Sequence, residues 1–336
     1  MLHSIPQAVD RRFSTIRNTL CLLVLCGLGG LTAAQTAYPD RPIRLVLSTP
    51  AGGPLDNLAR IVGEAASKVL GQPLLIDNRP GASGAIAVGY VTKQPADGYT
   101  LYMTADATFS LIPVVRKMPY RPIDDFSFVS SLVFAPQVFA VPAGLPVRTL
   151  PELVAKAKSE PGGLNYGMML GVPQHLDFER FKKASGTDIV LVPYQGGAPI
   201  LNAMLGGQVQ VSLMNASLFG EWIKQGKVRA LATTAKRRLP SLPDVPTLAE
   251  VGLPGLELDE GVNYVVVGPQ GMPNAVVGKL HTAFATALGN PEIRKRLEAI
   301  GYEVRVGPGD TLRADMVKAL VDNEKMVKAL NIRLTD

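Results

Sequence analysis

Beyond its first 34 residues, this 336-residue chain has no cysteine and only two histidines. Both cysteines, Cys21 and Cys26, fall within that first segment. The rest of the chain therefore forms no disulfide, and its fold must be held together by its hydrophobic core. His175 and His281 lie far apart in the sequence. They provide few ligands for a metal site and few partners for a catalytic nucleophile.

Sequence patterns of common enzymes are also lacking. The chain contains no G-x-S-x-G, no G-x-x-x-x-G-K-[ST] and no H-E-x-x-H segment. We therefore expect no catalytic residues, no metal and no cofactor. A hydrolase that works through carboxylates alone stays open, because a pair of acidic residues cannot be recognised from sequence.

The chain has only a slight excess of positive charge. The chain has 34 Lys and Arg against 28 Asp and Glu, and removal of the first 34 residues leaves a net charge of +4. No basic run and no alternation of basic with aromatic residues occurs, so we expect no nucleic-acid partner. After the first segment, no stretch approaches the ~18 apolar residues that a membrane span requires.

The first segment has the three parts of a secretory signal. Arg11, Arg12 and Arg17 precede the short apolar run 20–31, and small residues follow at Thr32-Ala33-Ala34. We predict a cleavable signal peptide over residues 1–34 and a periplasmic location; the alternative is an uncleaved anchor. The glycines and the shortness of the apolar run favour cleavage.

Short apolar strands alternate with helical patterns along the remaining chain, which predicts an α/β fold with mainly parallel sheets. A strand–loop–helix order seen in the first half occurs again after 164–168 and 189–192, as in two lobes of similar architecture. The late strand 263–267 returns most economically to the first lobe. We expect a clamshell in which lobe 1 comprises 38–140 plus 261–336 and lobe 2 comprises 141–260.

Two local predictions bear on this arrangement. Residues 104–108 are expected to form a polar loop after a strand that begins at Tyr99. Residues 127–142 are expected to form two apolar strands broken near Pro136.

Two glycine loops, each between a short strand and a helix, are the most informative feature. One contains Gly52-Gly53, with Asp56 in the first turn of the following helix, and the other is Gly81-Ala82-Ser83-Gly84. A helix start offers unpaired N–H groups and the positive end of the helix dipole, which favours an anion. Two such starts at the carboxyl ends of neighbouring strands predict one anion-binding crevice. An ordinary tight turn is the alternative for each loop.

Three side chains near these loops have two interpretations each. Ser83 is a helix N-cap, an anion-binding hydroxyl, or both. Arg79 pairs with a ligand carboxylate or forms a structural bridge to Asp77 or Asp97. His175, at a later helix start, contacts the ligand or serves in local capping and packing.

The two loop sequences resemble the paired signatures of the Bug receptors, the periplasmic solute-binding proteins of tripartite tricarboxylate transporters. The likeness continues in order over nearly the whole chain after the signal. It is carried by the segments Pro50-Ala-Gly-Gly-Pro-Leu-Asp56, Asn78-Arg-Pro-Gly-Ala-Ser-Gly84, Pro95-Ala-Asp-Gly-Tyr-Thr100, Val192-Pro-Tyr-Gln-Gly-Gly-Ala-Pro199, Leu205-Gly-Gly-Gln-Val-Gln-Val211, Leu242-Pro-Asp-Val-Pro-Thr247 and Pro269-Gln-Gly-Met-Pro273.

The resemblance implies a two-lobed type II periplasmic-binding fold that closes on a carboxylated metabolite and delivers it to membrane subunits. It also implies that the two lobe 1 loops together hold a single carboxylate through backbone amides, hydroxyls and ordered water. The positions that correspond in this chain are Gly52, Gly53, Asp56, Ala82 and Ser83, with Thr104 and Thr108 nearby.

This chain departs from the family pattern mostly in lobe 2. Met168 and Met169 stand where small hydroxyl residues are common, Met214 replaces an acid before Asn215, and Asn263 replaces an aromatic residue. Together with His175, we expect Met168, Met169 and Asn215 to face the ligand. Methionine predicts a less polar wall, and therefore a ligand with one firmly held carboxylate and an apolar or aromatic body. The alternative is that the methionines are buried under the loop.

We expect a non-catalytic, monomeric receptor whose ligand is a small carboxylate, such as a monocarboxylate or an aromatic acid, and whose partners are transporter membrane subunits. A receptor that reports to a signalling partner, and a hydrolase of a carboxylated substrate, remain alternatives.

Overall fold

Strands alternate with helices throughout the part of the chain that the structure, a computed structural model, describes: residues 38–169, 172–194, 196–252 and 261–330. The elements belong to Arg41–Asp336, which form one compact unit. The predicted signal peptide lies outside the described residues. Within them, no helix has the length and apolar character needed to cross a membrane.

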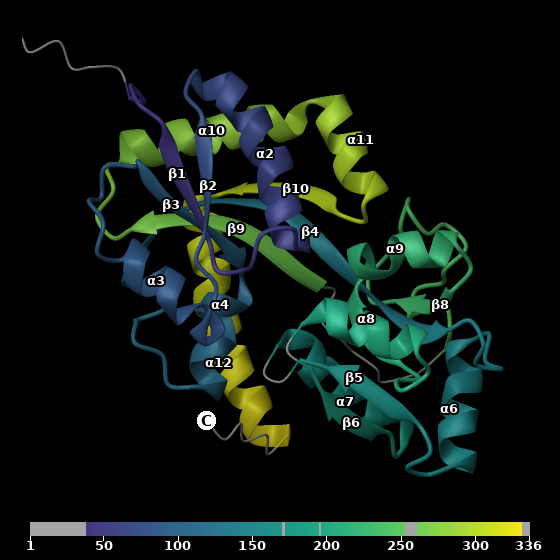
Figure 1. Cartoon of the computed structure of the whole chain (residues 1–336). Helices are drawn as coiled ribbons and strands as arrows, with labels where there is room; N and C mark the ends of the chain where they lie inside the picture. The colour runs from purple at the N-terminus through teal and green to yellow at the C-terminus, as the bar shows by residue number, and fades with distance from the viewer. Residues whose placement is uncertain (1–37, 170–171, 195, 253–260, 331–336) are drawn as a thin grey trace, which may run out of the picture. The chain divides into compact units, whose positions relative to one another are not determined.

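The first part of the chain forms βα units that lead into a long strand (Figure 1). In order these are β1 (Ile43–Leu47), α2 (Pro54–Leu70), β2 (Leu74–Asn78), the 3₁₀ turn η1 (Ala82–Gly84), α3 (Ala85–Val91), β3 (Thr100–Ala105), α4 (Ala107–Ser110), α5 (Ile112–Val115) and β4 (Phe126–Pro142).

A second set of elements follows: α6 (Leu150–Ser159), β5 (Asn165–Met168), α7 (Pro173–Ser185), β6 (Val190–Pro193), α8 (Gly197–Leu205), β7 (Ser212–Asn215), α9 (Ala216–Lys224) and β8 (Val228–Thr233). The chain then forms β9 (Gly261–Pro269), α10 (Asn274–Gly289), α11 (Pro291–Ala299), β10 (Glu303–Pro308) and α12 (Gly309–Leu330).

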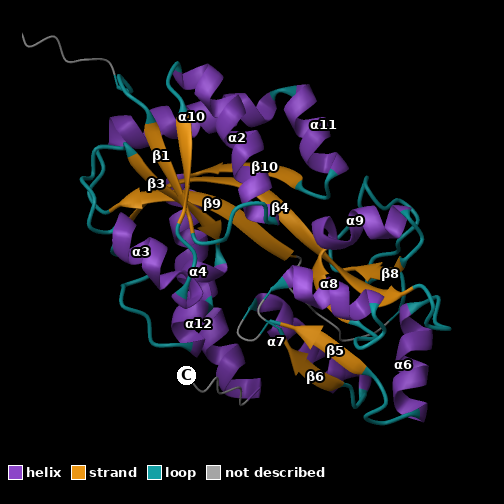
Figure 2. Cartoon of the chain, viewed as in Figure 1, coloured by secondary structure: helices purple, strands orange, loops and turns teal. Residues whose placement is uncertain are grey.

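Strand pairing divides these elements into two lobes, as predicted. Lobe 1 is built on a sheet of order β10-β4-β9-β3-β1-β2, so the late strand β9 does return to it. Lobe 2 contains β7 and β8, which pair with the far end of β4, and the separate pair β5-β6. In Figure 2, α2, α10 and α11 cover one face of the lobe 1 sheet, and α3, α4 and α12 cover the other.

The sheets are mixed, and in this detail the prediction of mainly parallel sheets was wrong. β1 is parallel to both β2 and β3, and β5 is parallel to β6. However, β4 is antiparallel to β7, β8, β9 and β10. Neither β4 nor β9 is joined to its neighbours in the sheet by a βαβ crossover, and only such crossovers impose a parallel arrangement.

The strand β4 is continuous through Pro136, where a break between two strands was predicted. Its partner changes at that point: Pro136 pairs with Gly261 of β9, and the next residue, Gln137, pairs with Asn215 of β7. Proline removes one hydrogen-bond donor from the ladder. Here that loss coincides with the exchange of one partner strand for another, so the strand does not end.

The helix α2 follows the predicted pattern closely. Pro54 occupies the first turn, where a missing N–H costs nothing, and Asp56 lies near the positive end of the dipole. Gly71 ends the helix in the left-handed conformation with φ 72°. In contrast, residues 104–108 are not a loop, because β3 continues to Ala105 and α4 begins at Ala107.

Close packing at the crossing between the lobes gives a test of the fold. A methyl group at Gly261 would overlap the carbonyl of Ala135 and the ring of Phe134. We predict that Gly261→Ala lowers the free energy of unfolding by about 1–3 kcal/mol, measured by urea denaturation. The control is Gly278→Ala on the exposed face of α10, where no neighbour lies within 4 Å. It should raise stability by about 0.5–1 kcal/mol. An unchanged midpoint for Gly261→Ala would contradict this account of the crossing.

Candidate ligand-binding cleft

The first glycine loop is held in shape by one buried carboxylate. Asp56 is 1% exposed, and its Oδ2 accepts hydrogen bonds from the Gly52 N–H (3.0 Å) and the Arg60 Nε (2.8 Å). The Asn78 amide, at the end of β2, donates to Asp56 Oδ1 (3.1 Å) and to the Thr49 carbonyl (3.0 Å). The carboxylate therefore fixes the β1–α2 loop and ties it to the neighbouring strand. Gly53 caps α2 from an extended conformation.

The electrostatics of Asp56 follow from these contacts. The Arg60 hydrogen bonds hold the pKa of the carboxyl below its ordinary value, against the opposing effect of burial, and the Gly52 and Asn78 donors act in the same direction. Because its acceptor capacity is taken up by the loop, Asp56 is a positioning residue here.

The second glycine loop has an unusual backbone. Gly81 and Gly84 have φ of 122° and 92°, and Ala82 between them has φ 47°. Among the described residues, Ala82 is the one non-glycine residue with positive φ. A conformation that costs energy and is held at a loop end is typical of functional sites. Ser83 belongs to the same turn, and its side chain lies outside what the structure describes.

Of the two roles considered for Arg79, the structure shows the structural bridge to Asp77. Its Nε donates to Asp77 Oδ2 (2.9 Å), which also accepts from Arg44 (2.9 Å). Its guanidinium lies 3.5 Å from the centre of the Tyr90 ring. The side chain is therefore directed toward β1 and α3.

A group of hydroxyls lies near the ends of β1 and β3, close to Gly84 of the second glycine loop. Thr104 and Thr108 are buried, with their Oγ1 atoms 2.8 Å apart. The Tyr102 hydroxyl lies near them and near Ser48. Burial raises its pKa above the ordinary value, and the neighbouring hydroxyls oppose this in part. Tyr102 Oη and Thr49 Oγ1 are buried and form no hydrogen bond with any described residue. Buried hydroxyls normally have a partner, so both are candidates for holding a ligand or water.

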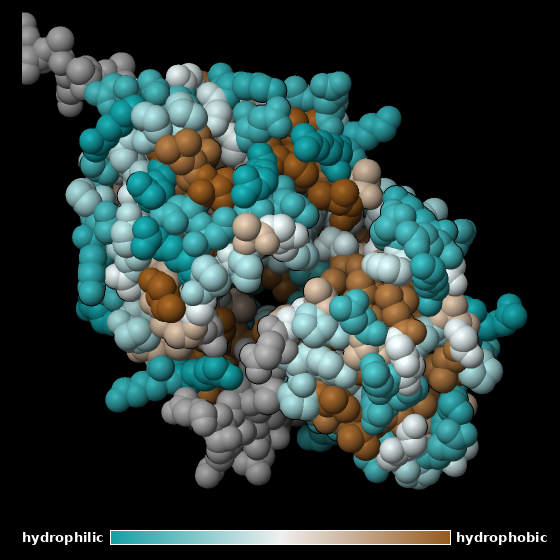
Figure 3. All heavy atoms as spheres, viewed as in Figure 1, coloured by the Kyte–Doolittle hydropathy of each residue, from teal (hydrophilic) through white to brown (hydrophobic). Residues whose placement is uncertain are grey.

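These features surround a cavity of about 580 Å³, within the range of small-molecule sites. Lobe 1 contributes residues 48–50 before the first glycine pair, the second glycine loop and α5, and lobe 2 contributes the ends of β5 and β6. The described lining does not include the predicted site residues Gly52, Gly53, Asp56, Thr104, Thr108, His175 and Asn215. The lining residues are Ser48, Thr49, Pro50, Pro80, Gly81, Ala82, Gly84, Ile112, Arg116, Met169, Val172, Pro193 and Tyr194. Figure 3 shows the surface hollowed between the region of α3 and α4 and that of α8.

Of the three lobe 2 methionines, one lines the cavity and two are buried. Met169 lines the cavity, beside Val172 and Tyr194. Met168 and Met214 are 0% and 5% exposed and belong to the core of lobe 2. The less polar wall is thus made by Met169 with two neighbours that the sequence did not single out.

His175 and Asn215 lie close to the junction of the lobes. His175 is buried in the first turn of α7, and burial lowers its pKa. The Asn215 Oδ1 accepts from Gln174 Nε2 (2.9 Å), and its Nδ2 donates to the Tyr264 hydroxyl of β9 (3.4 Å). Both ends of the Asn215 amide are therefore engaged, and one of them links lobe 2 to lobe 1.

Asn263, where the family pattern has an aromatic residue, fastens β9 to the end of β3. Its side-chain amide (2.8 Å) and its backbone N–H (3.2 Å) both donate to Asp106 Oδ2, and the Asp106 N–H donates to the Asn263 carbonyl (2.9 Å). The same carboxylate caps α4 through the Ala107 N–H. This position therefore stabilises lobe 1 beside the crossing.

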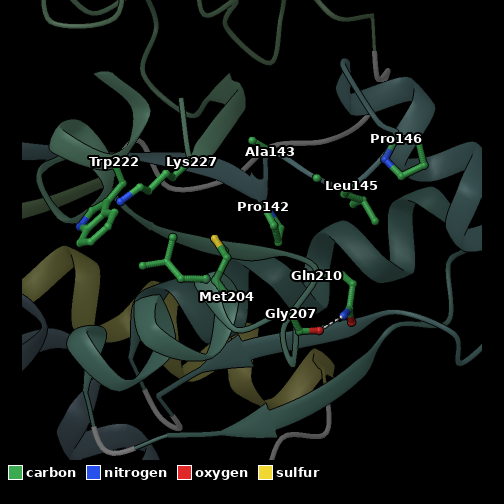
Figure 4. A pocket seen from close by; sticks show the side chains of 11 residues that line it. Pro142, Ala143, Leu145, Pro146, Met204, Gly207, Gln210, Trp222 and Lys227 are labelled. Atoms are coloured by element: carbon green, nitrogen blue, oxygen red, sulfur yellow. Dashed lines mark hydrogen bonds between the residues drawn. The ribbon is translucent and has the colours of Figure 1, made fainter. Parts of the chain in front are cut away.

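A second cavity, of about 690 Å³, lies within lobe 2 (Figure 4). The Pro142–Pro146 loop, Met204 and Trp222 line it, and Lys227 Nζ lies 4.9 Å from the Trp222 ring centre. Because every lining residue belongs to one lobe or to the end of β4, closure of the lobes cannot enclose a ligand there. The cleft between the glycine loops and Met169 is the better site.

Several contributors to the cleft were missed by sequence reasoning. The lining residues Ser48, Thr49, Arg116 and Tyr194 were not singled out, nor was the buried Tyr102 near Ser48. A signal did exist for Ser48-Thr49, because hydroxyl residues directly follow a strand at the edge where ligands bind. No local pattern marks Tyr102, whose place under the loops depends on strand pairing. In the described part of the chain, no three His, Cys, Asp or Glu side chains are grouped to hold a metal ion.

Two α/β lobes joined by a continuous strand, with a cleft lined from both, define a solute-binding protein of the periplasmic type. The sequence profile of the tripartite tricarboxylate transporter family receptor, TctC, matches residues 58–332. The chain belongs to this family, which includes the Bug receptors.

Individual relatives agree with this assignment. BugT of Bordetella pertussis is 31% identical over 297 residues, covering 87% of this chain and 89% of BugT. A structure of Rpa4515 from R. palustris with adipate is 34% identical, with a TM-score of 0.82, covering 88% of this chain and 99% of that one. MatC from Rhodopseudomonas palustris with bound malate is 30% identical, with a TM-score of 0.75, covering 86% and 100%.

The role of Asp56 gives a test that needs no ligand. Its lowered pKa means that it stabilises the fold above the carboxyl's ordinary pKa, and that this contribution is lost as the pH falls. We predict that Asp56→Asn lowers the free energy of unfolding at pH 7 by about 1–3 kcal/mol. The difference from wild type should shrink below about pH 4.

Denaturation at a series of pH values measures this effect. The control is Asp322→Asn, which removes an exposed carboxylate paired with Lys318 on α12 and should leave stability nearly unchanged. Equal effects of the two substitutions would show that Asp56 does not organise the loop.

Proposed function

We propose that this protein is an extracytoplasmic receptor that closes on a small carboxylate and passes it to the membrane subunits of a tripartite tricarboxylate-type transporter. The observation that carries the proposal is the asymmetry of the cleft. Lobe 1 contributes hydroxyls and glycine-loop backbone, whereas Met169, Val172, Pro193 and Tyr194 of lobe 2 form a more apolar wall. Two solved relatives contain carboxylates, adipate and malate.

In this proposal, the carboxylate is seated between the two glycine loops. Thr49 Oγ1 and Tyr102 Oη supply donors that have no partner among the described residues. The first turn of α2 adds the positive end of a helix of 17 residues. Loop amides of Gly53, Ala82 and Ser83 add further donors, whereas the Gly52 N–H is held by Asp56. A carboxylate is bound here by neutral, preorganised groups, so the receptor need not bury a paired cation beside it.

The body of the ligand lies against the opposite wall. Ile112 of lobe 1 faces the cavity with Met169 and Val172, and these side chains favour methylene groups or a ring. A citrate-like triacid would place charges against this wall without donors, which is costly. We therefore propose a carboxylate with an apolar body as the ligand.

Closure is proposed to occur about the crossing between the lobes. β4 changes partner between Pro136 and Gln137, and β9 begins at Gly261 on the same side. We propose that lobe 1 comprises 38–140 plus 261–336 and lobe 2 comprises 141–260, with boundaries close to this crossing. The ligand shifts the equilibrium toward the closed form, because only that form lets both walls contact it. The protein acts as a monomer and leaves the ligand chemically unchanged.

A thermal-shift screen of small carboxylates tests the proposed function. A ligand at one hundred times its Kd adds about 2.7 kcal/mol to stability, which raises the Tm of a protein of this size by several degrees. We expect linear or aromatic acids to raise the Tm more than citrate does. Failure of every carboxylate to raise the Tm would contradict the proposal, and chemical conversion of a bound acid, detected by mass spectrometry, would identify an enzyme.

The position of the carboxylate is tested by Tyr102→Phe, which removes one buried hydroxyl and keeps the ring in the core. We expect about a 5–30-fold loss of affinity for a ligand from the screen, measured by calorimetry, and little change in Tm without ligand. Tyr90→Phe is the control, because it removes the same hydroxyl from a ring that stacks under Arg79. Equal affinities for Tyr102→Phe and wild type would remove Tyr102 from the site.

A further inference from the structure

Three successive residues of lobe 1, Gly301, Tyr302 and Glu303, each lie against lobe 2. They lead from the end of α11 into β10, and we call them the 301–303 turn. Gly301 has φ 89°, and a methyl group there would lie 3.0 Å from the nitrogen of Ser217 at the start of α9. A residue without a side chain lets the two backbones approach this closely. The turn is therefore a contact between the lobes in addition to the continuous strand β4.

Glu303 makes a charged contact across the same boundary. Its carboxylate is buried and accepts a hydrogen bond from Arg305 Nη2 (3.1 Å) on its own strand. The Arg305 guanidinium lies 3.7 Å from the centre of the Phe134 ring, which limits its movement. Arg237, after β8 of lobe 2, lies 3.6 Å from the same carboxylate. This pair is exposed on the Arg237 side and contributes little stability, but it places lobe 2 beside the start of β10.

Tyr302 connects the turn to the first glycine loop. Its hydroxyl donates a long hydrogen bond to the carbonyl of Pro54 (3.4 Å), in the first turn of α2 directly after Gly53. The side chain is buried, and burial raises the pKa of the hydroxyl, which the nearby Ser217 hydroxyl partly offsets. One buried hydroxyl thus lies between a carbonyl of the glycine loop and the first turn of a lobe 2 helix.

The ring of Tyr302 has a second connection to lobe 2. It packs edge-on against the ring of Tyr264 on β9, with 5.9 Å between the centroids. The Tyr264 hydroxyl accepts from Asn215 Nδ2 (3.4 Å), and Asn215 is the residue directly before α9. Both connections therefore reach the same junction of β7 and α9. A movement of that junction changes the surroundings of the Tyr302 hydroxyl and, through it, those of the Pro54 carbonyl.

We propose that the 301–303 turn couples the first glycine loop to the position of lobe 2, with Tyr302 as a positioning residue that acts without contacting the ligand. The described lining of the cleft does not include Tyr302. The inference rests on the proposed function, because the glycine loop is a ligand site only there. Coupling of this kind is reciprocal: a carboxylate that orders the loop favours the position of lobe 2 in which Tyr302 keeps both contacts.

Distances between the lobes test the coupling without a ligand. In a background with Cys21→Ser and Cys26→Ser the full chain has no cysteine, so two introduced cysteines can be labelled specifically. Ala155→Cys on α6 and Lys279→Cys on α10 place one spin label on an exposed position of each lobe. Pulsed electron paramagnetic resonance then gives the distribution of inter-lobe distances.

Tyr302→Phe removes the hydroxyl and keeps the ring against Tyr264. We expect it to lower the population at the main wild-type distance, relative to other distances, about 2–5-fold, as the loss of one hydrogen bond predicts. Tyr166→Phe is the matched control, because that buried hydroxyl donates to the Gln174 carbonyl (3.2 Å) within lobe 2. It should leave the distribution unchanged.

A second pair of variants tests the close approach of the backbones. Gly301→Ala places a methyl group against the Ser217 nitrogen, and we expect it to lower the same population at least about 5-fold. Gly271→Ala is the control. Gly271 also has φ 89°, so alanine costs the same backbone strain there, but no described atom lies within 4 Å. Both alanine variants should lower the Tm, and only Gly301→Ala should change the distances.

Affinity is the second readout. Its probe is the linear or aromatic acid that raises the Tm of wild type most in the thermal-shift screen. We expect Tyr302→Phe to weaken binding of this acid about 2–5-fold, measured by calorimetry, and Tyr166→Phe to leave it unchanged. A shifted distance distribution with unchanged affinity would show that the turn is only a structural contact, and would overturn the coupling.

The remaining outcomes separate this inference from the proposed function. If Tyr302→Phe and Gly301→Ala leave the distances as in wild type, or if the controls shift them equally, the turn does not set the position of lobe 2, and the receptor function still stands. If the distances shift as expected but no carboxylate binds wild type, the proposed function is wrong, and with it the coupling to a carboxylate.

Discussion

The shape of the candidate site depends on a single buried carboxylate. Asp56 accepts from the Gly52 N–H in its own loop and from Asn78 at the end of the next strand. Asn78 in turn donates to the Thr49 carbonyl. Two loops from different βα units are thereby joined by hydrogen bonds to one charged group, which is a stronger tie than neutral pairs would give. The loops do not have to be ordered by the ligand, so less of the binding energy is spent on arranging them.

The two walls of the cleft differ in polarity. On the lobe 1 side, strand ends, glycine backbone and buried hydroxyls form a polar surface whose positions are set by the sheet. On the lobe 2 side, Met169, Val172 and Tyr194 follow strand ends in a lobe with its own core. In the proposed function, lobe 1 binds the carboxylate and the lobe 2 wall contacts the body of the ligand. It is also consistent with departures from the family pattern being concentrated in lobe 2.

Much of this arrangement followed from the sequence. The glycine loops, the limits of α2, the return of the late strand to lobe 1 and the two-lobed α/β class were all predicted from local patterns and from resemblance to the family. Local patterns failed where a long-range partner decides the outcome. Pro136 looked like a break, but β4 continues because it exchanges β9 for β7 there. Residues 104–108 looked like a loop, but pairing with β9 extends β3 to Ala105.

The sequence by itself determined that this protein has two glycine loops, each between a strand and a helix, and none of the catalytic motifs searched for, because such motifs are formed by residues a few positions apart. Only the tertiary structure decided which side chains face the cavity. It buried Met168 and Met214 in the core, turned Arg79 toward Asp77 and Tyr90, placed the Tyr102 hydroxyl near Ser48 and Gly84, and brought Arg116 to the cleft. The direction of a side chain and its burial depend on strand pairing and on packing between segments far apart in the chain, which local sequence does not encode.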